Sequence, residues 1–553
     1  MLKNKYFHPK LLTTLKKYTF SQFIQDIGAG VVVGIIALPL AIAFGIASGV
    51  EPQAGIITAI IAGFLIALLG GSRVQIGGPT GAFIVVVYGI VQKFGIDGLI
   101  IASIMAGLIL VLMGLFKIGD WIKFIPSPVT TGFTSGIAIV IFSSQVNDFL
   151  GLNIKKVPAE FIEKWEIYFQ HFSNINMYAF GLAISTIVIM ILMKKWPKIP
   201  SAFVALIITS VVSIIMKFPV ETIGSRFGSF NGTLPTFVIP HVDMATIKML
   251  IPVAFTIAIL GAIESLLSAV VSDGLIGGKH RSNTELIAQG IANIITPFFG
   301  GIPATGAIAR TATNIKNGGR TPIAGIVHAI TLLLIFLFFG KFAELIPMAT
   351  LAGILVVVSY NMSEWREFKI LLSSPRYDVA VLLITFFLTV VFDLTLAIEV
   401  GLVLSSFLFV NRITDNTEIN VLTLDSLKNN YDSYFNRPDS LENFELPRNV
   451  AVIEINGAFF FGAASKLFEI LSKISHEKEI IILRMNRVLS IDATGLKILH
   501  NFFKEVEAAN KKIILTDLNS QTSSFITHSK FFNKLDPNCL KSTINDALSD
   551  LKA

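Results

Sequence analysis

Long apolar stretches separated by short polar turns fill the chain from about residue 28 to residue 411. Most are close to the roughly 20 residues that an α-helix needs to cross a bilayer. They do not show the ten-residue alternation of membrane β-strands, so the pattern predicts a helical, polytopic membrane domain. After Arg412 the apolar stretches shorten and polar residues surround them, which predicts a second, soluble unit.

The apolar pattern predicts about fourteen membrane segments, half of them in each half of the domain. The first set is 28–49, 53–70, 79–92, 97–117, 128–150, 177–195 and 200–217. The second set is 247–273, 284–299, 304–315, 322–340, 345–360, 377–392 and 394–411. The third and the tenth segments are too short to cross a bilayer alone, as half-helices would be.

Lysine and arginine gather in alternate loops, which sets the expected orientation. With a cytoplasmic N-terminus, the loops on the inside are basic and the short loops on the outside are not, as the positive-inside rule requires. We therefore expect a multi-pass protein of the cell (plasma or inner) membrane with both termini in the cytoplasm. Basic residues of the inside loops include Arg73, Lys117, Lys194, Arg281, Lys316 and Arg376.

The amino-acid composition supports the membrane assignment and limits the kinds of binding partner that we expect. Charged residues make up 15% of the chain, against about 25% in soluble domains. The formal charge of +7 comes largely from these loops, so we expect a lipid bilayer and no nucleic acid as partner. Cys539 is the single cysteine, which excludes an intrachain disulfide and a cysteine metal cluster. The first twenty residues lack a signal-peptide cleavage pattern, and no signal peptide is expected.

Two Gly- and Pro-rich turns repeat in the two halves: GGPTGAF (77–83) and IPATGA (302–307). Each follows a Gly-Gly pair and leads into one of the two short segments. In secondary transporters, Gly- or Pro-interrupted segments at corresponding places in two repeats mark the binding site. The alternative is two ordinary membrane turns that share a common tripeptide, because Gly and Pro are frequent in membrane helices.

A helix start presents unpaired backbone N–H groups and the positive end of the helix dipole, about half a charge. Two half-helices that meet tip to tip would therefore attract an anion. Small residues suit these tips because they let an ion approach the backbone. The residues expected to bind the anion there are Thr80, Gly81, Ala82, Thr305, Gly306 and Ala307.

Two charged residues lie inside predicted membrane segments. Arg310 stands about one turn into the second half-helix, and a charge at membrane depth usually faces a cavity or a partner. We expect it to attract the anion; the alternatives are a place near the membrane face or a structural pair with Glu264. Glu264 lies in the middle of segment 247–273. Burial favours the protonated form of an isolated carboxylate, so Glu264 is the candidate proton carrier, with a permanent salt bridge to Arg310 as the alternative.

Phe44 follows the helix-breaking Pro39 in the first segment. A proline inside a membrane helix is tolerated where the backbone lines protein or water. We therefore name Phe44 as a candidate apolar lid over the anion, with plain packing as the alternative.

The C-terminal part alternates predicted strands (450–455, 480–483, 512–516) with predicted helices (461–474, 492–509, 540–551). This order is typical of a small α/β domain. It holds no phosphate-binding loop or catalytic constellation, so we expect no enzyme activity. The expected domains are a cytoplasmic N-terminal segment (1–20), a transmembrane transport domain (21–413), a linker (414–448) and a cytoplasmic α/β domain (449–553).

These residues resemble the SulP family of anion transporters, which includes sulfate permeases and bicarbonate transporters. The resemblance rests on ALPLAIAFGIASG (37–49), on the stretch from Pro52 to Arg73 and on GGRTPIAG (318–325). The signature departs at Ala54 and Ile57, where the family often has tyrosines. The tail resembles the STAS domain of the family, with SIDATGL (490–496) at its strand-to-helix turn.

The resemblance implies a seven-plus-seven inverted repeat, in which a core domain carrying the half-helices moves like an elevator against a gate domain. It implies a homodimer and an anion between segments one, three, eight and ten. The eight histidines show no metal-ligand spacing, so we expect no bound metal, and we expect no cofactor. It also implies that the STAS domain regulates transport or docks a cytoplasmic protein. Thr494 is a candidate phosphorylation site in it, with helix capping as the alternative.

Within the family, the transport half is similar to the sodium-dependent bicarbonate type. That resemblance implies a sodium site in segments eight and ten, whose positions here read Glu264, Ser268 and Gly306-Ala307-Ile308. Ile308 stands where those relatives have a threonine oxygen, so Ser268 would be the remnant of a cation site. Plant sulfate transporters resemble this chain in having Glu in segment eight and Arg in segment ten. We therefore expect a proton to be the coupling ion.

We predict a secondary active transporter of small inorganic anions, with sulfate by proton symport first and bicarbonate or a dicarboxylate, sodium-coupled or by exchange, second. Two helix tips and Arg310 sum to about +2, which suits a dianion while Glu264 is protonated. The competing functions are an uncoupled anion channel or voltage-driven motor, a sensor with vestigial transport, and a nucleobase transporter. Glu264 argues against the first, the two intact tips against the second, and Arg310 against the third.

Overall fold

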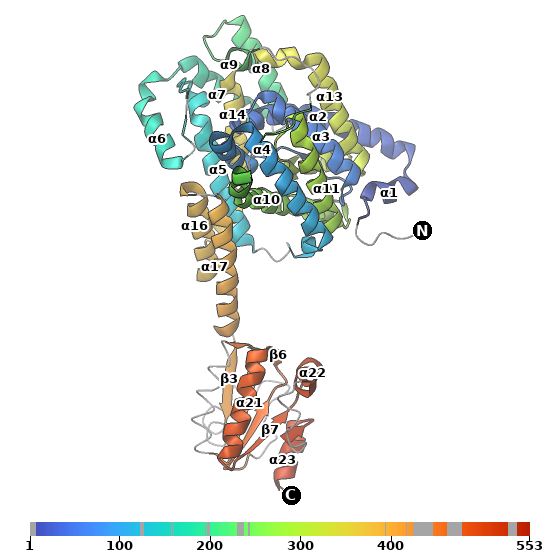
Figure 1. Ribbon diagram of the computed structural model, residues 1–553, viewed down its shortest axis with the longest axis vertical. Helices are drawn as coiled ribbons and strands as arrows, with labels where there is room; N and C mark the ends of the chain where they lie inside the picture. Colours follow the sequence, from blue (N-terminus) through green and yellow to red (C-terminus); the bar gives the residue numbers. More distant parts are fainter. Residues whose placement is uncertain are drawn as a thin grey trace. The chain divides into compact units, whose positions relative to one another are not determined.

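The structure is a computed structural model that describes residues 7–121, 126–155, 157–158, 160–193, 195, 200–228, 237–241, 244–392, 394–415, 417–423, 446–461, 478–528 and 539–552. The chain divides into two compact units, Met1–Val403 and Leu404–Ala553 (Figure 1). The division falls within helix α17 (Leu394–Asp415), before the end expected for the transport domain at residue 413. The same helix therefore ends the first unit and begins the second.

The first unit is mostly helical in its described parts, with two short strands, β1 (Gly77–Gly78) and β2 (Thr305–Gly306). Seven of the helices described in the chain are long and apolar enough to cross a membrane, and α7 and α8 are shorter apolar helices. Before α17 the α-helices are α1 (Lys10–Thr14), α2 (Phe20–Ala47), α3 (Pro52–Leu69), α4 (Phe83–Leu115), α5 (Ser127–Leu150), α6 (Phe161–Gln170), α7 (Met177–Met193), α8 (Ser201–Ile215), α9 (Ile223–Phe227), α10 (Met244–Ile276), α11 (Ser282–Ile295), α12 (Ile308–Lys316), α13 (Pro322–Phe339), α14 (Met348–Met362), α15 (Trp365–Leu371) and α16 (Arg376–Val391).

Each predicted membrane segment overlaps one of these helices, with three differences. The segments 79–92 and 97–117 follow one another in α4 with a break at Gly95, whose φ of 69° suits glycine. Helix α2 starts at Phe20 rather than near residue 28, and Pro39 does not end it. Helix α6 occupies part of a stretch expected to be a loop, because its mixed charge and apolar side chains gave no clear membrane signal.

The helix packing repeats between the two halves of the first unit. Helix α13 packs on α2 and α3, and α4 packs on α10 and α11 in the equivalent way. In the same manner α14 packs on α7 and α16 packs on α5. An inverted repeat predicts this exchange of partners. We name α2–α4 with α10–α13 the core bundle, and α5, α7, α8, α14 and α16 the gate bundle.

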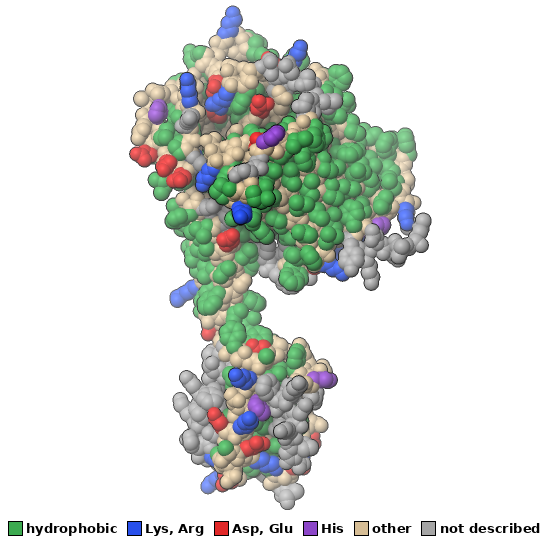
Figure 2. Space-filling model, viewed as in Figure 1, with side chains coloured by type: hydrophobic (Ala, Val, Ile, Leu, Met, Phe, Trp, Pro, Cys, Tyr) green, Lys and Arg blue, Asp and Glu red, His purple; other side chains and the backbone are tan. Residues whose placement is uncertain are grey.

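Large apolar side chains remain exposed on many helices of the first unit, including Phe116, Phe255, Phe338 and Phe387. Figure 2 shows such side chains covering a broad, continuous part of the face drawn. Soluble monomers rarely expose contiguous apolar patches of more than a few hundred Å². The exposed belt therefore fits contact with the hydrocarbon core of a bilayer.

Helices α4 and α11 cross at two glycines. A Cβ atom at Gly107 would lie 2.6 Å from the backbone oxygen of Gly290, and a Cβ at Gly290 would lie 2.5 Å from that of Gly107. Backbone cannot move aside as a flexible side chain can, so we expect Gly290→Val to push the helices apart. The expected loss is roughly 3 kcal/mol of unfolding free energy, seen as a lower melting temperature of the purified protein.

Gly181→Val on α7 is the matched control for this crossing, because a Cβ at Gly181 would meet nothing within 4 Å. Its melting temperature should stay close to that of the wild type. A Gly290→Val protein as heat-stable as the control would contradict the close crossing of α4 and α11.

The second unit is an α/β domain. Its described strands are β3 (Glu418–Leu422), β4 (Val450–Phe459), β5 (Ile480–Arg484), β6 (Val488–Ile491), β7 (Lys512–Thr516) and β8 (Leu540–Lys541), and its described helices after α17 include α21 (Ala493–Ala508), α22 (Ser520–His528) and α23 (Ile544–Lys552). The sheet order is β3-β4-β5-β7-β8, and β6 also pairs with β4. Strand β3 is antiparallel to β4, and the other pairs are parallel.

The strand and helix alternation is confirmed, with corrections at its edges. Strand β3 lies inside the predicted linker (414–448) and pairs with β4, so the sheet begins earlier than expected. Strand β6 and helix α22 were not predicted, because a four-residue strand and a short polar helix carry little periodic signal. The predicted helix 540–551 is wrong at its start, where Leu540–Lys541 form strand β8 and α23 begins at Ile544. The predicted helix 461–474 lies almost wholly outside the described residues.

The strand-to-helix turn of this domain is capped by Asp492, whose Oδ1 accepts a hydrogen bond of 2.7 Å from the Gly495 N–H. Such a cap satisfies one of the free amides at a helix start. The capping role considered for Thr494 therefore belongs to Asp492. Thr494 itself is exposed in the first turn of α21, and its phosphorylation stays a prediction.

Candidate functional site

The two Gly- and Pro-rich turns meet in the core bundle. Strand β1 (Gly77–Gly78) pairs antiparallel with β2 (Thr305–Gly306), with Gly77 opposite Gly306 and Gly78 opposite Thr305. Helix α4 begins soon after β1 and α12 soon after β2. A two-stranded contact between the halves therefore brings both helix starts to one place.

Glu285 at the start of α11 holds the loop that leads into β1. Its side chain is fully buried. Its Oε2 accepts hydrogen bonds from the backbone N–H groups of Gly71 and Ser72, at 2.8 and 3.0 Å. Its Oε1 accepts from the amides of Gln75 and Gln289, at 3.0 and 2.9 Å. Because a buried carboxylate is tolerated only when it is hydrogen-bonded, this cluster fixes the path of the loop.

Asn293, two turns further along α11, holds the loop that leads into β2. Its Oδ1 accepts from the Ala304 N–H and its Nδ2 donates to the Ala304 carbonyl, both at 2.8 Å. The side chain thus takes the place of a neighbouring strand. Glu285 and Asn293 together set the positions of both strands from one helix.

The role of α11 in holding the two loops was not predicted from the sequence. A signal was present, because Glu285, Gln289 and Asn293 recur every four residues and therefore share one face of α11. Glu285 lies at the start of the predicted segment 284–299, where a charge looks like a solvated end. Only the packing of α11 against the loops shows that the charge is buried.

The first tip is formed by Thr80, Gly81 and Ala82. The Thr80 hydroxyl donates a hydrogen bond of 2.8 Å to Oε2 of Glu264 on α10. Phe83 and Ile84 donate their N–H groups back to Thr80 and Gly81. The amides of Gly81 and Ala82 precede this first turn, where a helix leaves its N–H groups without intrahelical partners.

The second tip differs in register from the expectation. The Thr305 side chain is fully buried, and its hydroxyl donates to the Gly261 carbonyl at 2.8 Å. The Ala307 N–H donates to the Ile76 carbonyl at 2.9 Å. Helix α12 begins at Ile308, so the free amides of its first turn start at Ile308 and Ala309. Both of these residues are exposed.

Arg310 lies behind the paired turns and is 3% exposed. Its Nη2 donates a hydrogen bond of 2.5 Å to the carbonyl of Pro79, and its Nη1 is buried with no hydrogen-bond partner among the residues that the structure describes. Gly78 has a φ of 152°, which favours glycine, and a Cβ there would collide with the guanidinium. Although the structure describes both residues, it contains no ion pair between Arg310 and Glu264.

The remaining candidates take different positions. Glu264 is partly exposed, and Thr80 is its hydrogen-bond partner. Ser268, one turn along α10, is buried and donates to the Thr311 hydroxyl at 3.3 Å. Phe44 is 5% exposed within the main apolar core of the first unit, as the packing alternative expects.

Comparison with known proteins identifies the family of the chain. The profile of the Sulfate permease family matches residues 23–385, and that of the STAS domain matches residues 443–547. The chain belongs to the sulfate permease family. It is therefore a membrane transport protein by family, with a STAS domain at its C-terminal end.

The permease has relatives along nearly its whole length. It is 42% identical to "Putative sulfate transporter YvdB" of Bacillus subtilis (strain 168), in an alignment that covers 94% of this chain and 96% of the relative. It is 30% identical to "Bicarbonate transporter BicA" of Picosynechococcus sp., in an alignment that covers 95% of this chain and 94% of that relative.

Solved structures show the same fold. A structure of SLC26A9 matches with a TM-score of 0.86 at 17% identity, over 98% of the permease and 92% of that chain. The transmembrane domain of a cyanobacterial BicA matches with a TM-score of 0.63 at 32% identity, over 70% of the permease and 98% of that chain. A helical membrane domain followed by a STAS domain is thereby confirmed.

Proposed function

We propose that the permease is a secondary active transporter that imports inorganic anions, sulfate first, together with protons. The observation that carries this proposal is the meeting of two helix starts beside Arg310, whose buried Nη1 has no partner in the described part of the chain. An unpaired buried donor costs free energy. An anion at the tips would supply the missing acceptor and would interact with the free amides at both helix starts.

The position of Glu264 supports proton coupling. Its carboxylate is hydrogen-bonded to Thr80, a residue of the first tip, so its charge acts directly on the anion site. When Glu264 is ionised it offsets about half of the roughly +2 that the tips and Arg310 provide. Protonation removes this offset, so a dianion such as sulfate binds best together with a proton.

Two residues argue against a sodium site like that of the sodium-dependent relatives. Ser268 directs its hydroxyl to Thr311, which in turn accepts the Ile76 N–H at 3.1 Å. Ile308 brings no side-chain oxygen to the second tip. Because sodium binds through oxygen ligands, the proton is the better coupling ion. Bicarbonate or a dicarboxylate is the second candidate substrate, favoured by the similarity to BicA.

Contacts of the first tip support an elevator-type movement. A Cβ atom at Gly81 would lie 2.7 Å from Sδ of Met362 and 3.1 Å from Cδ1 of Ile141, both in the gate bundle. The tip therefore lies against the surface past which a moving core bundle would slide. We further propose a homodimer in the cell membrane with cytoplasmic termini, and a regulatory or docking role for the STAS domain with Thr494 as its phosphorylation site.

Uptake by purified protein in liposomes tests the proposed function. We expect labelled sulfate to enter faster with an inward proton gradient and without sodium, and faster than bicarbonate or succinate under the same gradient. Uptake that needs sodium would contradict proton coupling. Bicarbonate or succinate uptake above that of sulfate would replace the proposed substrate.

Gly81→Val tests the first tip. We expect a bulky side chain between the tip and Met362 to block close approach of the anion, and to reduce sulfate affinity at least 10-fold in a binding assay. The neighbouring side chains are flexible, so the protein should stay folded. Sulfate affinity equal to that of the wild type would remove Gly81 from the site.

The sequence analysis names Gly306 as an anion-binding residue, but Gly306→Val is expected to act mainly on stability. A Cβ at Gly306 would collide with the side chain of Gln75, which donates hydrogen bonds to Glu285 and to Ser265. The substitution should therefore disturb the support of the strands and lower the melting temperature, rather than block the anion selectively.

A further inference from the structure

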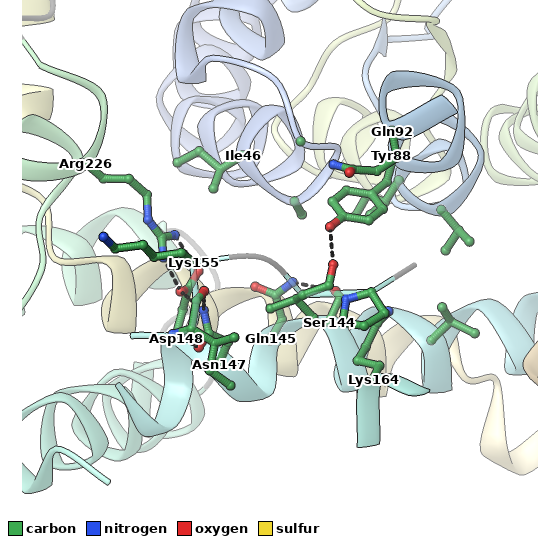
Figure 3. A pocket seen from close by; sticks show the side chains of 18 of the residues that line it. Ile46, Tyr88, Gln92, Ser144, Gln145, Asn147, Asp148, Lys155, Lys164 and Arg226 are labelled. Carbon is green, nitrogen blue, oxygen red and sulfur yellow. Dashed lines mark hydrogen bonds and ion pairs between the residues drawn. The ribbon is translucent and has the colours of Figure 1, made fainter. Parts of the chain in front are cut away.

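A cavity with several charged residues in its lining lies outside the tip site, with a volume of about 560 Å³. Helices α2 and α4 line one side, and α5, α6 and α9 with the loop after α5 line the other. Figure 3 shows Arg226, Lys155 and Asp148 toward one end of it, and Tyr88, Gln92 and Lys164 toward the other. Neither the tip residues Thr80 to Ala82 nor Arg310 belongs to its lining.

Lys164 of α6 is the unusual group in this cavity. The residue is 4% exposed, and within the described part of the chain its ammonium has no hydrogen bond or ion pair. Buried ammonium groups are costly unless they are paired. Helix α6 lies outside the membrane-spanning helices, and burial there lowers the pKa of Lys164 to about 8. At neutral pH the side chain is thus largely charged and lacks a counterion.

The other charges at the cavity do not supply this counterion. Asp148 accepts two hydrogen bonds from Arg226, at 3.1 and 3.0 Å, and Glu221 forms an ion pair of 3.0 Å with the same guanidinium. Both lining carboxylates are therefore engaged with Arg226. Lys155 adds a further positive charge at the rim, so the lining carries three cations against two carboxylates.

Hydrogen bonds between side chains and backbone hold the lining of this cavity in place. The Tyr88 hydroxyl of α4 donates a hydrogen bond of 2.7 Å to the Val157 carbonyl, and this bond ties the loop after Lys155 to the core bundle. Gln145 Nε2 donates to the Ser144 hydroxyl at 2.8 Å, and Gln92 lines the same space. Tyr88, Gln92 and Gln145 thus place neutral polar groups in the lining of the same cavity as Lys164.

We propose that this cavity is a second anion-binding site, in which Lys164 pairs with a small inorganic anion before or after it occupies the tips. Tyr88 lies five residues beyond Phe83, about 8 Å of helix rise, so the cavity adjoins the tip site along α4. The proposal does not depend on transport or on its coupling ion. A protein that binds anions without moving them would still have this site.

Trp165 provides an optical probe next to the site, because it follows Lys164 and its buried indole nitrogen has no hydrogen-bond partner among the described residues. Replacing the other three tryptophans, Trp121, Trp196 and Trp365, by Phe leaves Trp165 as the single indole of the full-length protein. We expect a saturable change of its fluorescence on titration with sodium sulfate at ionic strength held constant with sodium gluconate.

Four variants in this background decide the assignment. Lys164→Gln should weaken the sulfate-dependent change at least 10-fold, and Lys164→Arg should retain it. Lys341→Gln, an exposed lysine away from the cavity, is the matched control and should behave as the wild type. Arg310→Gln should lose sulfate uptake but keep the Trp165 change, so failure of the proposed transport function is distinguished from failure of this site.

A pH titration of the parent protein gives an answer even if Lys164→Gln does not fold. Anion pairing needs the ammonium form, so the affinity for sulfate should fall between pH 7 and pH 9, where sulfate keeps its charge. The charged and titratable groups that line the cavity with Lys164 are Tyr88 from α4, Asp148 from α5, Arg226 from α9, Lys155 and Glu221. Burial raises the pKa of Tyr168 on α6, so its hydroxyl stays neutral in this range. An unchanged affinity across the range, no fluorescence change in the parent, or loss of the change in Arg310→Gln would each overturn the proposal.

Discussion

Glu264→Gln is expected to abolish the acceleration of sulfate uptake by an inward proton gradient while anion exchange continues. Glutamine mimics the protonated carboxyl group and still accepts the hydrogen bond of Thr80. The anion site therefore keeps its shape and its favourable charge. The variant cannot bind and release a proton at this position, so a pH gradient cannot drive its sulfate uptake. Exchange of one anion for another requires no net proton movement.

Uptake and exchange of labelled sulfate in liposomes measure this result on one preparation. Glu285→Gln is the matched control, because its buried carboxylate accepts hydrogen bonds from two backbone amides and two side-chain amides. An amide there places N–H against N–H and should cost about 2–3 kcal/mol of stability. Glu264 has one partner and forms no ion pair with Arg310, so its variant should melt near the wild-type temperature.

Two outcomes would overturn the proton-carrier role of Glu264. One is a folded Glu264→Gln protein that a pH gradient still drives. The other is a strong loss of stability in this variant, which would show that the carboxylate is structural, like Glu285.

Arg310→Gln is expected to reduce sulfate binding by at least 30-fold and to abolish measurable uptake. The substitution removes the charge that would face the anion and the hydrogen bond to the Pro79 carbonyl. Removing one partner of a buried, hydrogen-bonded charge pair costs about 2–5 kcal/mol, which corresponds to this range of affinity. Arg310→Lys should keep part of the affinity, because a lysine retains the charge but not the planar set of donors.

Equilibrium binding of labelled sulfate to purified protein checks the Arg310 prediction, with melting temperature as the control for folding. Phe44→Leu is a useful companion, since Phe44 is buried in the apolar core and should affect stability more than affinity. Wild-type sulfate affinity in a folded Arg310→Gln protein would contradict the role of Arg310. A large loss of affinity in a fully stable Phe44→Leu protein would restore its proposed role as a lid.

Local patterns in the chain predicted the architecture and where the site would lie. Helix-length apolar segments are easy to recognise because a lipid environment requires most residues over a span to be apolar, and a charge such as Arg310 is conspicuous for the same reason. The repeated turns at 77–83 and 302–307 were visible because a close backbone approach needs small residues. Strands β4, β5 and β7 were predictable because buried parallel strands are continuous apolar runs.

Tertiary structure alone decided which groups at the site are free. Thr305 and Ala307 carry the repeated motif, yet Gly261 and Ile76 satisfy their polar groups, so the second tip begins at Ile308. Glu285 looks like a segment end in the sequence, and only the loops packed around it make it a buried support. Lys164 looks like a loop lysine, and only the meeting of α4, α5 and α6 buries it. Hydrogen-bond partners and burial depend on segments distant in the chain, and no local pattern contains them.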